Sequence, residues 1–379
     1  MVVGVLVVDD SNFFRQRICK IIDNFDGMKV VGVASNGKEA IVKNAALKPD
    51  IITMDYEMPG MDGVTAIRQI MADRPVPVMM LSSLSYDGAR VTLNALEAGA
   101  ADYLLKDYES FAKAANSTQS ELYQKLKGLS AKSTTDFYKN HYVSGNDAHH
   151  TEPEVPRANM ARSQAHPSAP NTQATPAVTT IREVSTNEGC FNSFEVLLIG
   201  CSTGGPALLN RLLSEVSVTF PLPIVIALHM PEYFTSIFAK RLNQLSSLQV
   251  KLAESGDILK SGYVYLAPGG KQLIFDKESS KKLVVIPNSK ELNYSPSVDV
   301  LFASAARTVG KKALGLVLTG MGCDGREGAR VLKSAGGSIW IQDKKTCVVY
   351  GMPGSIATAN LADEEFAAEQ LIKKFKAGR

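Results

Sequence analysis

A serine lies in a glycine-rich run whose spacing is suited to nucleophilic chemistry, Gly200-Cys201-Ser202-Thr203-Gly204-Gly205. The apolar segment 196–199 precedes this run directly. A strand that ends in Gly-x-Ser-x-Gly before a helix exposes the serine hydroxyl at a tight turn. Serine alone is a poor nucleophile and needs a base, which is usually a histidine. The run therefore predicts a nucleophilic serine if a histidine lies beside Ser202.

His229 is the histidine best placed to serve as that base. The chain has five histidines, and the other four lie in a polar stretch that is typical of an unfolded segment: His141, His149, His150 and His166. A histidine beside apolar residues is often only a packed core group. His229, however, ends an apolar segment in the same region as Ser202, so we expect it to act as the base.

A carboxylate should orient the histidine, and Asp324 is the preferred candidate. It lies in a glycine-rich turn just beyond an apolar segment, whereas Asp257 and Asp299 do not. The run 320–325 also spells G-x-G-x-x-G, and Asp343 ends the next apolar segment, where a ribose-binding acid belongs. A dinucleotide-binding domain is therefore an alternative, although it leaves Ser202 and His229 without a role.

A second group of reactive side chains lies near the N-terminus. Asp9 and Asp10 follow the first apolar segment, and Asp55 follows the third. In a doubly wound sheet these strand ends lie side by side, and converging carboxylates suit a hard cation such as Mg²⁺. Ser82 and Lys106 end the fourth and fifth segments and add a hydroxyl and a cation. We expect Asp55 to carry a phosphoryl group, although strand-end acids can also merely cap helices, as Asp10 could.

The elements that must position these residues alternate between strand and helix patterns. Such alternation predicts an α/β protein with two doubly wound parallel sheets. Strands are expected at 3–8, 29–33, 51–54, 76–81 and 102–105, and then at 195–199, 223–228, 263–266, 313–318 and 338–342. Helices are expected near 12–24, 37–47, 63–72, 87–98 and within 108–130, and then at 206–215, 233–244, 297–309 and 325–335.

Composition bounds the organisation of the chain. The 379 residues suffice for two domains, expected at 1–130 and 191–379. Residues 131–190 are polar and proline-containing, which predicts a long flexible linker. The net charge of +3 gives no support to a nucleic-acid partner. Five scattered cysteines indicate reduced thiols, and no apolar run approaches a membrane span, so we expect a cytoplasmic protein without membrane insertion.

Residues 1–107 resemble a response-regulator receiver domain, which is flavodoxin-like. The matching runs are Val8-Asp9-Asp10-Ser11, Met54–Gly63, Leu81-Ser82-Ser83 and Leu105-Lys106. The resemblance implies that Asp55 is the phospho-acceptor, and that Asp9, Asp10 and the Glu57 carbonyl surround Mg²⁺. It also places Tyr103 where the family often has a switching aromatic, together with the switch residues Ser82 and Lys106. One departure is Asp107, which stands where the family usually has a proline after the lysine.

Residues 194–360 resemble the Rossmann-like catalytic domain of the CheB-type chemotaxis methylesterases. The resemblance is carried by Ile199–Pro206, His229-Met230-Pro231 and Leu318–Gly325, with support from Tyr265–Gly269, Ser295–Asp299 and Gly351-Met352-Pro353. It implies that Ser202 is the nucleophile, His229 the base and Asp324 the acid, with backbone N–H groups of Thr203 and Met321 as the oxyanion hole. Departures are Cys201 and Cys323, which replace smaller or polar residues, and Gln272, where a histidine is frequent. Cys201 is expected to be a small packing residue and not the nucleophile.

Together the resemblances imply a phosphorylation-activated hydrolase that removes methyl esters from chemoreceptor glutamates, with some members also deamidating glutamines. In the family the unphosphorylated receiver covers the catalytic face. The implied partners are a chemotaxis histidine kinase, as phosphodonor, and methyl-accepting chemoreceptors, as substrate. Mg²⁺ is expected at the receiver site, and no cofactor is expected for ester hydrolysis. The alternative from another class is a receiver-controlled signalling scaffold without catalysis.

Overall fold

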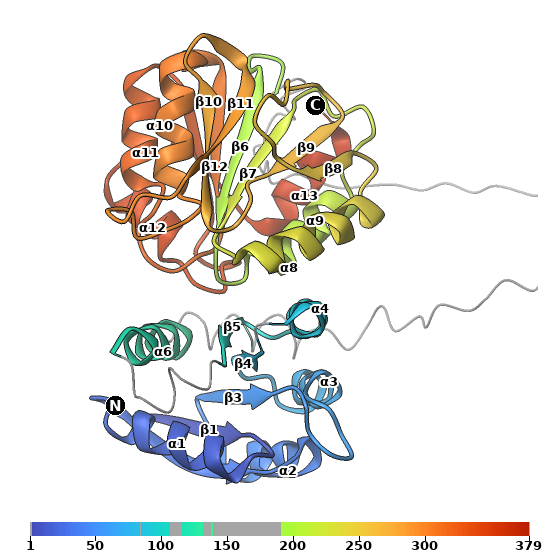
Figure 1. Cartoon of the computed structure of the whole chain (residues 1–379), viewed down its shortest axis with the longest axis vertical. Helices are drawn as coiled ribbons and strands as arrows, with labels where there is room; N and C mark the ends of the chain where they lie inside the picture. The colour runs from blue at the N-terminus through green and yellow to red at the C-terminus, as the bar shows by residue number, and fades with distance from the viewer. Residues whose placement is uncertain (1, 84, 107–115, 132–137, 139–190, 379) are drawn as a thin grey trace, which may run out of the picture.

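The structure is a computed structural model that describes residues 2–83, 85–106, 116–131, 138 and 191–378. It contains two α/β units, one on each side of the segment expected to be a linker (Figure 1). That segment, with His141, His149, His150 and His166, lies outside the described residues except for its positions 131 and 138. The expectation of a flexible linker therefore stays a prediction.

The first unit is a five-stranded parallel sheet with flanking helices, as the sequence predicts. The strand order is β2-β1-β3-β4-β5, so the carboxyl ends of β1, β3, β4 and β5 lie next to one another. The strands are β1 (Val3–Val8), β2 (Met28–Ala34), β3 (Ile51–Asp55), β4 (Val78–Ser82) and β5 (Asp102–Leu105). The helices are α1 (Asn12–Asp23), α2 (Gly37–Leu47), α3 (Gly63–Asp73), α4 (Tyr86–Glu97) and α6 (Asn116–Leu129).

Polar residues at the strand-to-helix junctions fix where the helices of this unit begin. The side chain of Asn36 accepts the Glu39 N–H at the start of α2, and Ser85 does the same for Gly88 at the start of α4. Asp62 accepts the Thr65 N–H at the start of α3. Each of these bonds satisfies a backbone donor that the helix leaves unpaired.

The second unit is a seven-stranded parallel sheet of order β14-β13-β12-β6-β7-β9-β8. Its strands are β6 (Val196–Cys201), β7 (Ile224–Leu228), β8 (Gln249–Leu252), β9 (Tyr263–Leu266), β12 (Ala313–Val317), β13 (Ser338–Gln342) and β14 (Glu364–Phe366). Its helices are α8 (Gly205–Ser214), α9 (Glu232–Leu245), α10 (Val298–Thr308), α11 (Arg326–Ser334), α12 (Met352–Thr358) and α13 (Ala368–Ala377), with a short 3₁₀ turn at Gly310–Lys312. The predicted catalytic residues lie in the loops that follow the three central strands β12, β6 and β7.

The sheet separates two hydrophobic cores, because alternate residues of a strand point to opposite faces. In β6, Leu197 and Ile199 belong to the core that includes α8, α9 and α13, whereas Val196 and Leu198 belong to the core that includes α10 and α11. Figure 1 shows these two helical layers on either side of the sheet. Burial on both faces explains why the central strands read as continuous apolar runs.

Several elements of the second unit were not expected from the sequence. The hairpin of β10 (Lys271–Asp276) and β11 (Ser279–Pro287) forms a separate antiparallel sheet. The edge strands β8 and β14 and the helices α12 and α13 were also missed. These strands are short and partly exposed, so their hydrophobic pattern is weak.

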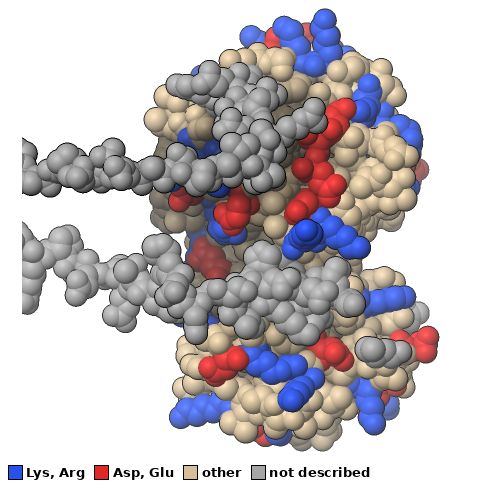
Figure 2. All heavy atoms as spheres, turned by 180° about the vertical axis from the view of Figure 1, so that it is seen from behind, with Lys and Arg blue, Asp and Glu red and all other residues tan. Residues whose placement is uncertain are grey.

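Two further features concern the surface charge and the helices. On the face shown in Figure 2, basic and acidic side chains both occur on each unit, and a run of acidic side chains crosses the upper one. Among the described residues, no helix has the length and apolar character needed to cross a bilayer.

Candidate active site and acidic cluster

The serine turn joins β6 to α8 and depends on glycine. Ser202 follows the buried Cys201 at the end of β6. Gly204 has φ +77°, and a Cβ there would lie 2.6 Å from the Val348 side chain. A larger residue would therefore strain the backbone and displace a neighbour. The result is a serine held at the carboxyl edge of the sheet by a turn that only glycine fits.

The pairing register of strands β6 and β7 places His229 beside Ser202. Cys201 pairs with Leu228 across β6 and β7, so Ser202 and His229 are the next residues beyond the paired ends. The His229 N–H also donates to the Cys201 carbonyl at 3.1 Å. Among the described residues no hydrogen bond joins the Ser202 hydroxyl to the His229 ring. Such contacts are often loose in the absence of substrate.

Asp324 contacts the far edge of the His229 ring. Its Oδ2 lies 2.7 Å from His229 Nε2, and its side chain is almost fully buried. With Nε2 engaged by the carboxylate, Nδ1 is the ring nitrogen left for the serine. The structure thus brings His229 and Asp324 into direct contact, while Asp257 instead pairs with Lys251 at 2.8 Å.

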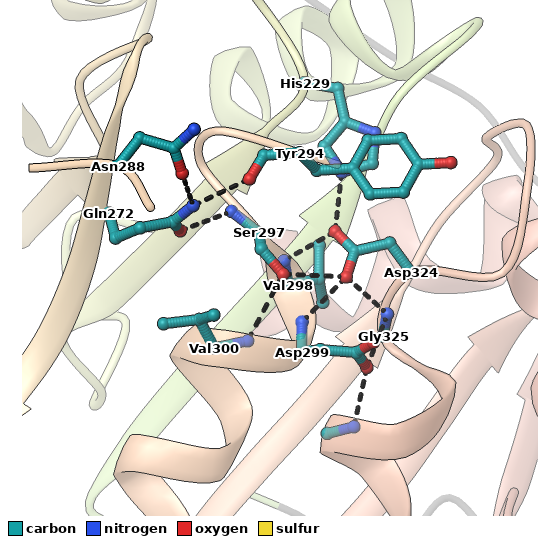
Figure 3. Close-up of polar contacts among 11 residues, drawn as sticks. His229, Gln272, Asn288, Tyr294, Ser297, Val298, Asp299, Val300, Asp324 and Gly325 are labelled. Atoms are coloured by element: carbon teal, nitrogen blue, oxygen red, sulfur yellow. Dashed lines mark hydrogen bonds and ion pairs between the residues drawn. The ribbon is translucent and has the colours of Figure 1, made fainter. Parts of the chain in front are cut away.

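The first turn of α10 stabilises the charge on Asp324 (Figure 3). The carboxylate accepts the Ser297 hydroxyl at 2.9 Å, the Val298 N–H at 2.7 Å and the Asp299 N–H at 3.0 Å. Burial alone would raise the pKa of Asp324, but His229 and these backbone donors outweigh it and hold the pKa below its ordinary value. Asp324 is therefore suited to remain an anion beside the histidine.

A cavity of about 680 Å³ lies over these residues. Ser202, Thr203, His229 and Met321 line one side of it. Among the described residues, the backbone N–H groups of Thr203 and Met321 donate to no protein acceptor. They are therefore available to stabilise a developing oxyanion, the role that the family resemblance implies for them.

The first unit forms the opposite wall of the same cavity. Its β5 and α6 contribute Asp102, Tyr103, Glu121 and Lys125 to the lining. Figure 1 shows the β5, α4 and α6 side of the first unit facing the second. The candidate catalytic groups therefore lie in a space bounded by both units.

Specific contacts hold the two units together. The ring of Tyr103 stacks on Phe234 of α9, with centroids 4.8 Å apart. The Thr203 hydroxyl, next to Ser202, donates to Asp102 Oδ2 at 2.6 Å, and the Gly204 N–H donates to the Ala101 carbonyl at 3.2 Å. Asp102 of the first unit is thus hydrogen-bonded to Thr203, a predicted oxyanion-hole residue of the second unit.

A polar cluster at the end of α4 completes this interface. Glu97 accepts from Asn210 of α8 at 2.7 Å and from Arg241 of α9. Arg241 also donates to Asn94 at 2.8 Å. Sequence reasoning missed Glu97, Asp102 and Arg241, because charged residues at an interface carry no motif or spacing that sets them apart from ordinary surface residues.

The acidic cluster forms at the carboxyl edge of the first sheet. Asp9, Asp10 and Asp55 each offer an oxygen within 4.8 Å of the others. Lys106 Nζ lies 2.8 Å from Asp9 Oδ2 and 2.7 Å from Asp55 Oδ2. Burial raises the pKa of Asp55 to about 6 although Lys106 opposes the shift. One cation thus faces three carboxylates.

This donor set fits a divalent cation. It contains only oxygen ligands, and the buried Asp9 Oδ2 has Lys106 as its sole partner within the described part of the chain. Mg²⁺ prefers such ligands, and its charge would relieve the repulsion among the acids. The role of the Glu57 carbonyl stays a prediction, and Asp107 lies outside the described residues.

The switch candidates Ser82 and Tyr103 lie on neighbouring strands. Ser82 ends β4 and its hydroxyl accepts the Thr92 hydroxyl of α4 at 2.6 Å. Tyr103 is buried in β5 at the interface described above. The two residues thus connect the acidic edge of the sheet with the elements that touch the second unit.

The structure gives the glycine loop 320–325 no space for a phosphate at the start of α11. Asp299 Oδ1 accepts the Gly325 N–H at 2.9 Å and the Gly328 N–H at 2.6 Å. A carboxylate therefore occupies the place that a dinucleotide phosphate would take. Asp343 is likewise engaged, because it accepts the Thr346 N–H at 3.0 Å. This geometry argues against the dinucleotide-binding alternative.

Cys201 is unsuited to be an alternative nucleophile. Its side chain is fully buried, and burial raises the pKa of its thiol well above the ordinary value. A thiol that stays protonated is unreactive. Its Sγ instead packs against Gly205, where an added Cβ would lie 2.9 Å away.

The CheB methylesterase family matches residues 197–375, and the response regulator receiver domain family matches residues 5–113. A Vibrio parahaemolyticus protein named protein-glutamate methylesterase/protein-glutamine glutaminase is 45% identical over 376 residues, which are 99% of this chain and 98% of that protein. A Vibrio cholerae protein with the same name and the number 1 is 43% identical over 383 residues, which are 99% of this chain and 98% of that protein. The crystal structure of the Thermotoga maritima CheB methylesterase catalytic domain is 38% identical and covers 48% of this chain and 98% of that one, with a TM-score of 0.46. The identity to the two Vibrio proteins over nearly the full length shows that the chain belongs to the CheB methylesterase family, with a receiver domain before its methylesterase domain.

Proposed function

We propose that this protein is a phosphorylation-activated hydrolase that converts glutamate methyl esters of chemoreceptors to glutamate. The observation that carries the proposal is the arrangement of Ser202, His229 and Asp324 in the loops after three adjacent strands, with Asp324 bonded to His229. The names of the relatives, protein-glutamate methylesterase/protein-glutamine glutaminase, support this substrate class. Deamidation of receptor glutamines would pass through the same acyl-enzyme.

The contacts of Ser202, His229 and Asp324 support the following reaction. The Ser202 hydroxyl attacks the ester carbonyl while His229 Nδ1 takes the hydroxyl proton, and Asp324 stabilises the resulting imidazolium. The N–H groups of Thr203 and Met321 hold the oxyanion. The intermediate expels methoxide, which receives the proton from His229 and leaves as methanol. Water, deprotonated by His229, then attacks the acyl-serine. The bond to Ser202 Oγ breaks, this oxygen takes the proton back from His229, and the glutamate leaves.

The proposed control resides in the first unit. Asp55 receives the phosphoryl group from a chemotaxis histidine kinase, with Lys106 beside it. Asp9, Asp10 and the Glu57 carbonyl would hold Mg²⁺, which when bound neutralises negative charge at the phosphoryl group. Ser82 and Tyr103 would transmit the change to the interface. Because the receiver forms one wall of the cavity, its displacement would open Ser202 to a protein substrate.

We also propose the division of the chain into a receiver at 1–130, a linker at 131–190 and a methylesterase domain at 191–379. The family matches at 5–113 and 197–375 support these boundaries. A cytoplasmic location is part of the proposal. The described cysteines Cys19, Cys201, Cys323 and Cys347 are free thiols, which are common in a reducing compartment.

Phosphodonor activation tests the proposed function. Acetyl phosphate with Mg²⁺ should raise methanol release from methylated receptor membranes by the wild type about tenfold or more. The Asp55→Asn variant should keep the basal rate and lose the activation, because an amide cannot form the acyl phosphate. Asp73→Asn, at the end of α3, is a matched control. Activation of Asp55→Asn equal to that of the wild type would contradict the role of Asp55.

Weakening the interface from the receiver side should raise the basal rate. Glu97→Ala removes the acceptor for Asn210 and Arg241 and leaves both catalytic-domain side chains intact. Loss of contacts worth about 1 kcal/mol shifts the balance between closed and open arrangements about fivefold. Methanol release without phosphodonor should increase by about that factor. Asp87→Ala, on the same helix but 84% exposed, should leave it unchanged, and equal rates in the two variants would show that this cluster does not restrain the enzyme.

A further inference from the structure

The His229 imidazole is contacted on one face by an aromatic ring that no catalytic motif includes. Tyr294 stacks on it with the ring centroids 4.3 Å apart and the planes 7° from parallel. Asp324 holds one edge of the imidazole through Nε2, and the Ser202 hydroxyl does not hold the other edge within the described structure. The orientation of the ring therefore depends on an edge contact with Asp324 and a face contact with Tyr294.

One buried amide fixes the segment that carries Tyr294 (Figure 3). Gln272 Nε2 donates to the Tyr294 carbonyl at 2.6 Å and to Asn288 Oδ1 at 2.8 Å. Gln272 Oε1 accepts the Ser297 N–H at 2.8 Å. The side chain of Gln272 is fully engaged and only 1% of the residue is exposed. The two ends of the segment 294–297 are thus attached to the same point of the β10–β11 hairpin.

This segment supports both partners of the His–Asp pair. Tyr294 packs on the His229 face, and Ser297 donates its hydroxyl to Asp324 at 2.9 Å. A displacement of the segment would therefore move the ring support and the carboxylate support together. Gln272 stands on a strand that sequence analysis did not expect, and it fixes this common support from outside the three catalytic motifs.

We propose that Tyr294 is a positioning residue that holds the His229 ring in its productive plane, with Gln272 as its anchor. The proposal rests on the function proposed above. The aromatic face is the part of Tyr294 that matters, since among the described residues its hydroxyl makes no hydrogen bond. When His229 takes the serine proton it becomes a cation against the face of an aromatic ring, which attracts positive charge. The contact is then stronger in the transition state than with bound ester, so it should act on kcat more than on KM.

The test compares two replacements of Tyr294 in the full-length, phosphodonor-activated protein. Tyr294→Phe keeps the ring, and its kcat for methanol release should stay within about twofold of the wild type. Tyr294→Leu removes the ring at similar apolar bulk, and its kcat should fall about ten- to a hundredfold with KM changed by less than about threefold. Tyr233→Leu, an exposed tyrosine in α9, is the matched control and should leave both constants unchanged.

A spectroscopic measurement tests the positioning role without any substrate. The proton between His229 and Asp324 should give a low-field NMR signal in the wild type and in Tyr294→Phe. The signal should shift or broaden in Tyr294→Leu and in Gln272→Glu, which loses the donor to the Tyr294 carbonyl. This readout separates failure of the positioning proposal from failure of the proposed esterase function, and a thermal melt verifies that each variant is folded.

Three results would overturn the proposal. The first is an unchanged kcat and an unchanged low-field signal in Tyr294→Leu. The second is a loss in Tyr294→Phe as large as that in Tyr294→Leu, which would assign the effect to the hydroxyl. The third is an increase in KM alone, which would make Tyr294 a wall of the substrate cavity that it also lines.

Discussion

Ser202→Ala should lower methanol release from methylated receptors by about 10⁴-fold or more, in the phosphodonor-activated protein. Removal of a triad serine eliminates the acyl-enzyme route and leaves only the contributions of binding and the oxyanion hole. The structure supports a loss in the chemical step, because Ser202 lies at a strand end beside His229 and contributes no side-chain hydrogen bond to the fold within the described residues. The measurement is kcat for methanol release from a single batch of methylated receptors, and KM is determined in parallel.

Ser214→Ala is the matched control for this change. Ser214 is an exposed serine at the end of α8 whose hydroxyl donates to the Arg211 carbonyl. Its replacement should leave methanol release within about twofold of the wild type. If Ser202→Ala released methanol as fast as Ser214→Ala, the esterase assignment would be wrong, and the receiver-controlled scaffold without catalysis would become the better interpretation.

Asp324→Asn should lower kcat by about 10³- to 10⁴-fold while the protein stays folded. The carboxylate accepts from His229, from Ser297 and from backbone N–H groups of α10. An asparagine presents an NH₂ group toward at least one of these donors, which favours the wrong histidine tautomer and leaves a buried donor unpaired. The imidazolium formed during catalysis would also lose its counter-charge. Methanol release and a thermal melt measure the two consequences separately.

Asp257→Asn is the control for the loss of a carboxylate in the same domain. Asp257 accepts the Glu254 N–H and pairs with Lys251 away from the cavity. Its replacement should affect kcat by less than about threefold. Comparable losses in both variants would mean that Asp324 contributes only to folding, and Asp324 would then no longer be the orienting acid.

Much of the fold could be predicted because its central strands are buried on both faces. The runs 263–266 and 338–342 and the helix 37–47 were predicted with the bounds that the structure has. The candidate residues could also be grouped, since parallel strands bring their carboxyl ends to one edge. That rule placed Asp9 and Asp55 together, and it placed Ser202 beside His229.

The remaining parts of the fold and of the site could not be predicted, because they depend on contacts between segments far apart in the chain. The β10–β11 hairpin is half exposed and its pattern is weak, so the anchor Gln272 could not be connected to Tyr294 beforehand. Asp299 was considered only as a rival triad acid, whereas it accepts the N–H groups at the start of α11. The interface residues Asp102 and Glu97 have ordinary surface chemistry, and only docking of the two units gives them a role.

The most direct test of a receiver-gated serine esterase is methanol release from one preparation of methylated receptor membranes, measured before and after addition of acetyl phosphate and Mg²⁺. The wild type should show a low rate that rises about tenfold or more after the addition. Ser202→Ala should show no release above the blank in either condition. The account would be contradicted if Ser202→Ala released methanol as fast as the wild type. It would also be contradicted if acetyl phosphate left the wild-type rate unchanged.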